Sequence, residues 1–149
     1  IDGVAPYVAP GEVACIWTDD ESHPYYQVAR DAYETLSNAV DAKGRKLKIH
    51  KLCMGANPIA LDEEAAATID MVETAKERTT DYEVMGSYLN FLIVNGGVIV
   101  PQYDDPNDAL AIEQIQAMFP DREIVGVNTT QILYGGGNIH CITQQEPKA

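Results

Sequence analysis

The sequence has few basic side chains and no long apolar run. Ten Lys and Arg stand against 23 Asp and Glu, so the net charge is −13 at pH 7. Without a basic stripe to displace counterions, the composition argues against nucleic acid as a partner. The longest apolar run, residues 91–100, is interrupted by Asn95-Gly96-Gly97 and is too short to cross a bilayer, so we expect no membrane partner. The acidic balance favours a cationic small molecule, with ordinary solubility as the alternative.

Cysteine and histidine patterns are also sparse. The three cysteines, Cys15, Cys53 and Cys141, form no C-x-x-C pair, and we therefore expect a reducing, cytoplasmic setting. No H-E-x-x-H motif and no histidine pair at i, i+4 occurs, so the sequence predicts no metal site. The chain starts at Ile1 with neither a methionine nor a signal-peptide pattern, and we expect a processed or truncated piece of a longer protein.

Apolar periodicity and turn signals predict an α/β chain. Strands are expected at residues 4–8, 13–18, 47–52, 84–94, 98–103 and 123–127. Helices are expected at 24–40 and 109–119, capped by acidic clusters at 18–22 and 104–108, with a short helix within 63–71. Helical spacing gives the two long helices buried faces made of Val28, Ala32, Tyr33, Leu36 and Ala39, and of Leu110, Ile112, Ile115 and Met118. Residues 55–80 are the least regular stretch.

An internal repeat organises these elements. Residues 10–13 and 95–98 begin 85 residues apart, and Asp19-Asp20 matches Asp104-Asp105 at the same offset. Each copy follows the order strand, turn, strand, double aspartate, helix, strand. The segment from Gly135 onward resembles the first strand of a third copy. Self-similarity of this kind predicts a modular array in which each unit leaves an uncovered face for its neighbour.

Three glycines lead into a candidate nucleophile, Cys141. Glycines permit positive φ and close approach to the main chain, so a cysteine after them can lie at the mouth of a cleft. The alternative is a tight loop followed by a structural cysteine. His140 is adjacent, but on the expected strand its side chain points to the opposite face, so we do not expect it to be the base.

Polar side chains also enter the first strand of each copy. Asp2, Asn90 and Asn138 hold these positions, and in a pseudo-symmetric array such strands line a common axis. A carboxylate there could bind a planar cation through two parallel hydrogen bonds. For Asp2, an accidental position at the chain end is the alternative.

The segment 135–145, Gly-Gly-Gly-Asn-Ile-His-Cys-Ile-Thr-Gln-Gln, resembles the C-terminal signature of agmatine deiminases in the guanidine-modifying (pentein) superfamily. Further matches are Pro10-Gly11-Glu12-Val13, Trp17-Thr18-Asp19-Asp20, residues 41–46, Ser87-Tyr88, Asn90-Phe91 and Asn95-Gly96-Gly97. The resemblance covers nearly the whole chain and is weakest over residues 53–84.

The resemblance implies a fold and a set of site residues. The family fold is a five-bladed α/β propeller, so residues 1–149 would form its C-terminal portion, with repeat units at about 1–54 and 84–129 and a cysteine segment at 132–149. Cys141 matches the nucleophile, and Asp2 matches the guanidinium-binding aspartate of a His-x-Asp motif whose histidine would precede Ile1. We expect Asn90, Gly136 and Gly137 to contribute to substrate binding. No metal or organic cofactor is implied.

The implied reaction converts agmatine and water to N-carbamoylputrescine and ammonia through a Cys141 thiouronium intermediate, in polyamine biosynthesis. Without the histidine we expect the isolated chain to be poorly active. Two alternatives stay open. The chain could be a non-catalytic half-propeller that acts by assembly, with itself or with a missing N-terminal half, or the substrate could be peptidyl-arginine.

Overall fold

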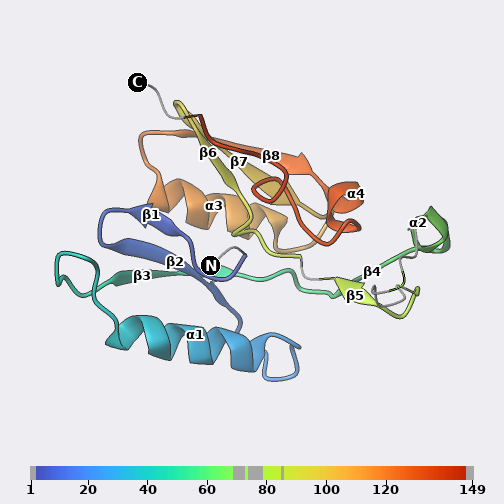
Figure 1. Cartoon of the computed structure of the whole chain (residues 1–149), viewed down its shortest axis with the longest axis horizontal. Coiled ribbons are helices and arrows are strands. Elements are labelled where there is room, and N and C mark those ends of the chain that lie inside the picture. The colour runs from blue at the N-terminus through green and yellow to red at the C-terminus, as the bar shows by residue number, and fades with distance from the viewer. Residues whose placement is uncertain (1–2, 69–72, 74–78, 85, 147–149) are drawn as a thin grey trace.

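Two three-stranded sheets of the same connectivity form the body of the chain (Figure 1). The computed structural model describes residues 3–68, 73, 79–84 and 86–146. The first sheet contains β1 (Tyr7–Ala9), β2 (Glu12–Trp17) and β3 (Lys48–Cys53), with α1 (Tyr26–Asn38) between β2 and β3. The second contains β6 (Leu92–Val94), β7 (Gly97–Gln102) and β8 (Glu123–Asn128), with α3 (Asp108–Met118) between β7 and β8. In both, the central strand pairs antiparallel with the first strand and parallel with the third, so the sheets are mixed.

The hairpins of the two sheets occupy equivalent positions in the sequence. β1 and β6 begin 85 residues apart, and so do β2 and β7. Each hairpin turn contains a glycine with positive φ, 83° at Gly11 and 81° at Gly96, a conformation that glycine adopts without steric cost. The hairpin predicted around Asn95-Gly96 is therefore confirmed.

The single strand predicted over residues 84–94 is wrong. Among the described residues of this stretch, the extended ones belong to β5 (Glu83–Val84) and β6, and residues 86–91 have no regular strand or helix. Tyr88, Leu89 and Phe91 are buried, which explains the strand-like apolar run. The backbone and side chain of Asn90 instead bond to a loop far along the chain, as described below.

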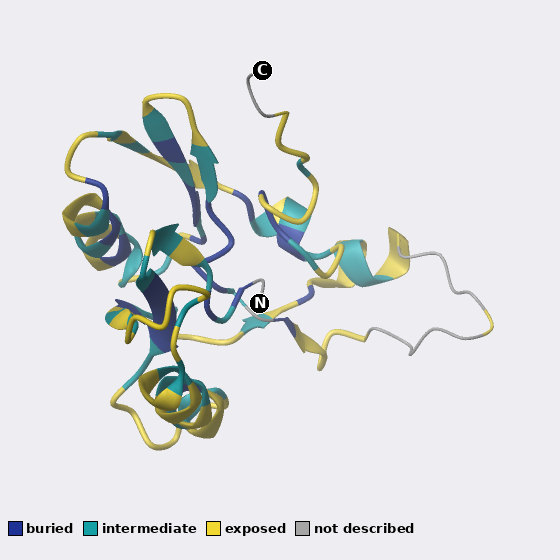
Figure 2. Ribbon diagram, turned by 60° about the vertical axis from the view of Figure 1, so that its left-hand side comes forward, coloured by how far each residue is buried: buried dark blue, intermediate teal, exposed yellow. Residues whose placement is uncertain are grey.

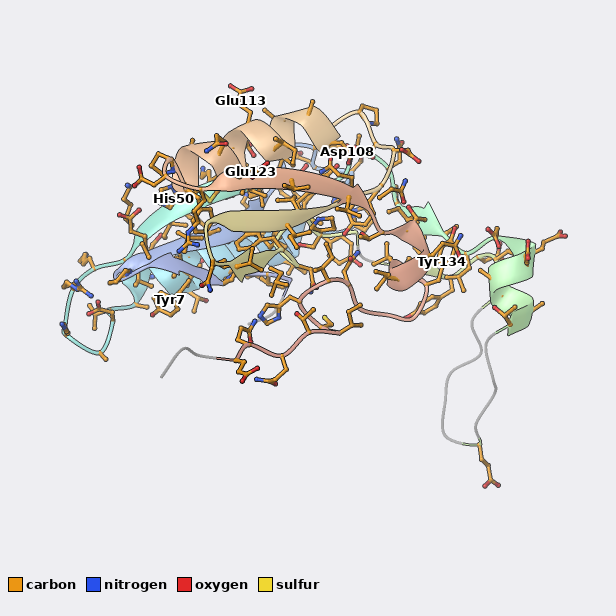
Figure 3. The ribbon with its side chains drawn as sticks, turned by 90° about the horizontal axis from the view of Figure 1, so that it is seen from above. Tyr7, His50, Asp108, Glu113, Glu123 and Tyr134 are labelled. Carbon is orange, nitrogen blue, oxygen red and sulfur yellow. The ribbon has the colours of Figure 1, made fainter. Side chains whose placement is uncertain are left out.

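The buried faces of the two long helices agree with the prediction only in part: Ile115 is buried as expected, but Val28 and Leu110 are not. Val28 and Leu110 are each 42% exposed, whereas the neighbouring alanines, Ala29 and Ala111, are fully buried. A methyl side chain lets the helix axis approach the sheet closely, so the larger residue one position earlier turns outward. On α3, Glu113 lies on the outer side, away from the sheets (Figure 3). No helix in the described ranges is both long enough and apolar enough to span a bilayer.

Helix α3 joins the two sheets. It packs on β8 of its own sheet and on β3 of the other (Figure 1). Gln114 accepts the backbone N–H of Cys53 through Oε1 at 2.8 Å, and Asn107 donates through Nδ2 to the carbonyl of Met54 at 2.8 Å. Asp105, just before the helix, accepts the N–H of Ala56 at 2.9 Å. The two sheets are thus connected by hydrogen bonds as well as by apolar packing.

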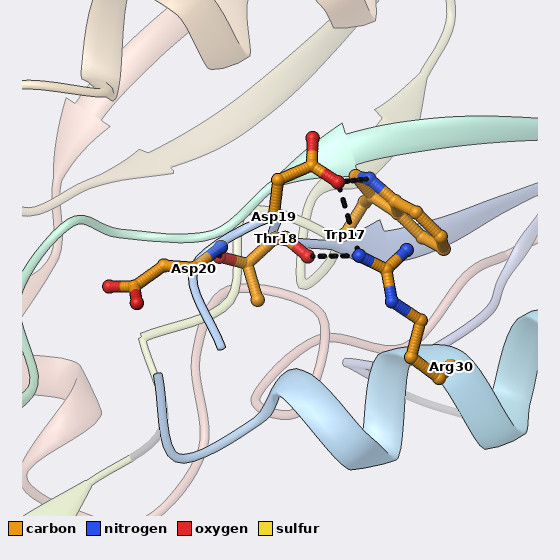
Figure 4. A network of polar contacts seen from close by, with 5 residues as sticks. All are labelled: Trp17, Thr18, Asp19, Asp20 and Arg30. Carbon is orange, nitrogen blue, oxygen red and sulfur yellow. Dashed lines mark hydrogen bonds and ion pairs between the residues drawn. The ribbon is translucent and has the colours of Figure 1, made fainter. Parts of the chain in front are cut away.

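The acidic cluster at 18–22 does not cap α1. The N-cap of this helix is Tyr25, which makes no side-chain capping bond. Asp19 instead accepts from Trp17 Nε1 and from Arg30 Nη2, both at 3.1 Å, and the Arg30 guanidinium lies 3.6 Å from the Trp17 ring centroid (Figure 4). The acid therefore attaches the side of α1 to the end of β2, which a capping pattern read from sequence does not predict. The cluster at 104–108 makes no side-chain cap at Asn107 either.

The described residues 55–68 and 79–84 form an arm that extends away from the two sheets (Figure 2). Its described elements are β4 (Ile59–Ala60), α2 (Glu63–Thr68) and β5, with β4 and β5 antiparallel. The short helix expected within 63–71 is present to Thr68, and residues 69–71 lie outside the described ranges. Asp62 accepts the N–H of Ala65 at 2.6 Å and caps this helix.

Candidate active site

The strand expected from Gly135 onward is not formed. The chain passes through a short helix, α4 (Thr130–Leu133), and then through turns to Glu146. Local groups satisfy the backbone there: Asn138 Oδ1 accepts the N–H of Ile139 at 2.8 Å, and Thr143 Oγ1 donates to the carbonyl of Ile139 at 2.9 Å. Polar side chains that bond their own neighbourhood compete with a sheet ladder, which explains the error.

Two of the three glycines have separate structural reasons. Gly136 has φ 90°, a conformation that other residues adopt only with strain. Gly137 lies against the cysteine, because a Cβ added to it would be 2.8 Å from Cys141 Cβ and 3.2 Å from Cys141 Sγ. Gly136 therefore allows the turn, and Gly137 leaves room for the Cys141 thiol.

Asn90 contacts Cys141 through both ends of its amide. Its Nδ2 lies 3.1 Å from Cys141 Sγ and donates to it. Its Oδ1 accepts the backbone N–H groups of His140 at 3.0 Å and of Cys141 at 3.3 Å. Asn90 is 7% exposed, whereas Cys141 is exposed to solvent. A buried amide thus holds an accessible thiol.

A cavity of about 310 Å³ contains Cys141, Asn90, Gly136 and Gly137 in its lining. These are four of the five site residues expected from the sequence, drawn from segments about 50 residues apart. The fifth, Asp2, lies outside the described residues. Its neighbour Gly3 lines the same cavity, and the Gly3 carbonyl accepts from Ser87 Oγ at 2.6 Å. The residues are brought together, although their roles stay predictions.

Behind the cysteine lies a buried polar chain that the sequence did not indicate. Tyr103 donates through its hydroxyl to the carbonyl of Ser87 at 3.1 Å and accepts from Asn138 Nδ2 at 3.1 Å. Burial raises the pKa of Tyr103, so its phenol stays neutral and can donate. Ser87 falls in a family-like motif, but nothing in the pattern around Tyr103 distinguishes it from a core aromatic residue.

Glu83 is the one charged side chain among the described residues that line this cavity. It is exposed and is accompanied in the lining by Tyr25 and Tyr82. Burial raises the pKa of Tyr25, and the negative charges that Tyr82, when ionised, and Glu83 carry raise it further. All three side chains line the Cys141 cavity. The described lining is therefore negative in sign and aromatic, a combination suited to a cation.

The histidines of the chain lie elsewhere. His140 lines a second cavity of about 490 Å³ together with Leu89 and Phe91. His140 and Cys141 thus line different cavities. We expected their side chains to diverge on a strand, but the two residues lie in a turn. His23 accepts the N–H of Tyr25 at 3.1 Å, and His50 bonds to Glu12 at 2.7 Å. None of the three appears in the described lining of the Cys141 cavity. In the same described ranges, no three His, Cys, Asp or Glu side chains form a potential metal site.

Comparison with known proteins gives a consistent set of relatives. The model of a family described as Porphyromonas-type peptidyl-arginine deiminase matches residues 1–147. A Streptococcus mutans protein named "Putative agmatine deiminase" is 60% identical over 147 residues, which cover 99% of this chain and 39% of the relative. The agmatine deiminase of Pseudomonas fluorescens is 48% identical, with coverage of 99% and 40%.

Solved structures agree with these relatives. The structure of the agmatine deiminase of Enterococcus faecalis superposes with a TM-score of 0.92 at 56% identity, and the match covers 99% of this chain and 40% of that one. The chain therefore spans about 40% of the length of the relatives it matches. Its fold is that of the corresponding part of a deiminase structure.

Proposed function

The chain belongs to the Porphyromonas-type peptidyl-arginine deiminase family, and we propose that the protein hydrolyses agmatine to N-carbamoylputrescine and ammonia. The observation that carries the proposal is the position of Cys141 Sγ, which borders a cavity with a carboxylate in its described lining. A thiol that accepts a hydrogen bond and a negative cavity together suit attack on a cationic carbon. We place the reaction in a reducing compartment, because the three cysteines of the sequence form no C-x-x-C pair and no disulfide-framework spacing.

The chemistry follows from the thiolate. Cys141 Sγ adds to the guanidinium carbon, and a new C–S bond forms while one C–N π bond moves its electrons to nitrogen. The C–N bond to one amino group then breaks, and that group leaves as ammonia with a proton from an acid. Water adds to the resulting thiouronium carbon and returns one proton to the acid. The C–S bond then breaks, the second proton of the water is lost to ammonia as ammonium, and the urea product leaves with regeneration of the thiolate. No redox change or cofactor enters this scheme.

Agmatine is favoured over peptidyl-arginine by the described lining. Agmatine carries a second cation, a primary ammonium at the far end of a four-carbon chain, whereas an arginine residue in a peptide has a neutral amide backbone there. Glu83 with Tyr25 and Tyr82 supplies a charged and aromatic place for that ammonium. We therefore assign Glu83 to recognition of the distal end of the substrate.

We also propose that the two sheets are adjacent blades of an α/β propeller, covering residues 1–54 and 84–129. β3 packs against two helices, α1 and α3, whereas the helix that packs against β8 is α3. Val125 and Val127 alternate along β8 and are 42% and 43% exposed. A further blade that packs on β8 as α3 packs on β3 would cover them.

A chimera tests the proposed activity. This chain replaces the 148 residues that it matches in the Enterococcus faecalis agmatine deiminase, and ammonia and N-carbamoylputrescine are measured with agmatine as substrate. We expect turnover that the Cys141→Ala variant abolishes. We expect the isolated chain to be slower by about 10²–10⁴-fold, because none of its histidines lies in the described lining to act as acid or base. A folded chimera that hydrolyses an arginine peptide but not agmatine would overturn the substrate assignment.

A further inference from the structure

Asn90 is fixed in the fold independently of the cysteine loop. Its neighbours Tyr88, Leu89 and Phe91 are 0%, 2% and 3% exposed, so the chain is buried on both sides of it. The Tyr88 hydroxyl donates to Asp108 Oδ1 at 2.7 Å, which ties this segment to the start of α3. The backbone of Asn90 is therefore held in place by its buried neighbours, and the loop at 137–142 bonds to it through the N–H of His140.

The orientation of the Asn90 amide follows from its partners. Oδ1 is committed to two backbone donors, the N–H groups of His140 and Cys141, and the Asn90 carbonyl also accepts the His140 N–H at 3.2 Å. A flipped amide would place its NH₂ group against these donors and lose both bonds. Nδ2 must therefore face Cys141 Sγ, where it lies 3.1 Å away.

We propose that Asn90 is a positioning residue for Cys141, and that its amide stabilises the thiolate instead of binding substrate. An N–H donor bonds more strongly to a charged sulfur than to a neutral thiol, so this contact favours the reactive form. The same amide holds the backbone N–H of Cys141 and so sets where Sγ lies in the cavity. Gly137, which has no side chain, leaves free the space that the Cys141 side chain occupies. The inference rests on the proposed role of Cys141 as nucleophile.

Asn90→Asp separates the two functions of the amide. The aspartate keeps an oxygen for the two backbone N–H groups, so the loop stays attached, but it replaces the donor facing Sγ with a second, negative acceptor. The variant is compared with Asn38→Asp, which makes the same chemical change on the exposed surface of α1. Asn90→Ala, which removes both functions, is the second variant.

The measurement is the rate of iodoacetamide modification of Cys141 in the 149-residue chain from pH 6 to 10, followed by peptide mass spectrometry. We expect Asn90→Asp to move the midpoint of the rate profile upward by about one pH unit and to slow modification at pH 7 about tenfold. Asn90→Ala should slow it about threefold, and Asn38→Asp should match the wild type. Circular dichroism checks that each variant is folded.

Two results would overturn the inference. One is a folded Asn90→Asp variant with the wild-type profile. If Asn90→Asp does not fold, the second result is a folded Asn90→Ala variant with the wild-type profile. Because modification reports on the thiol itself, an inactive chimera with a shifted Asn90→Asp profile would reject the proposed function and leave the role of Asn90 standing.

Discussion

Gly137 and Cys141 are in such close contact that a Cβ on the glycine would lie 2.8 Å from the Cβ of the cysteine. This separation is shorter than real Cβ contacts, so any side chain at position 137 must move the thiol. The contact explains why a glycine is needed at a position whose φ is not positive. Steric exclusion next to Sγ, more than backbone freedom, is the requirement there.

Gly137→Ala should therefore displace Cys141 at modest cost to the fold. We expect a loss of about 1–3 kcal/mol in the free energy of unfolding and a fall of about 10²-fold in turnover by the chimera. Chemical denaturation and ammonia release measure the two effects. Gly55→Ala is the matched control, because its added Cβ would make only ordinary contacts, at 3.5 Å and beyond. Equal effects of the two substitutions would show that the contact with Cys141 has no special role.

The three cysteines should differ in reactivity with pH. Burial raises the pKa of Cys15 and of Cys53 to about 11, so both are neutral thiols through the physiological range and react slowly. Cys141 is exposed and should be modified first by iodoacetamide at pH 7–8. Peptide mass spectrometry identifies the order of modification. Modification of Cys53 before Cys141 would contradict the prediction.

The raised thiol pKa values also predict a direction for stability. The unfolded chain releases the protons of Cys15 and Cys53 near the ordinary value of 9.0, and the folded chain holds them to about 11. The free energy of unfolding should consequently fall as pH rises from about 9 to 11. Thermal unfolding of the wild type and of Cys53→Ser over this range gives the measurement. The wild type should lose more stability with pH than Cys53→Ser, and parallel curves would count against the assignment.

Glu83→Gln should weaken recognition of the distal ammonium. In the chimera we expect KM for agmatine to rise about tenfold, because a charge-assisted contact is replaced by a neutral one. Butylguanidine, which has the same chain without the ammonium, should be turned over equally by both proteins. Glu64→Gln on α2 removes one exposed carboxylate elsewhere and serves as control. An equal rise in KM for both substrates would point to a structural effect.

Asp105 and Asp20 occupy equivalent positions but should contribute differently to stability. The Asp105 carboxylate accepts from Asn107 within its own turn and also from Ala56 across the junction with β3. The Asp20 carboxylate accepts from the N–H and the hydroxyl of Ser22, within its own turn. We expect Asp105→Ala to cost about 1–3 kcal/mol and Asp20→Ala about 0.5 kcal/mol. Urea denaturation decides the difference. Equal costs would mean that the bonds across the junction add nothing.

Local sequence determined much of the architecture. The 85-residue offset and the glycine turns at Gly11 and Gly96 identify two equivalent hairpins, because turn chemistry acts within a few residues. The helices and third strands of both units follow from periodicity with small errors at their ends. The same local rules fail at Val28 and Leu110, since they cannot tell which of two adjacent apolar residues faces the sheet.

The candidate site, too, was only partly predictable from local sequence. The sequence by itself determined that Cys141 follows a glycine turn, and its pattern selected Asn90 and Gly136 as polar or flexible positions. Only the tertiary structure decided that the 86–91 segment is not a strand and that its asparagine bonds to the cysteine loop. It also decided that Tyr103 and Glu83 line the cavity, and that His140 lines another. These relationships join residues about 20 to 60 positions apart, and side-chain contacts over that separation depend on packing, which periodicity does not encode.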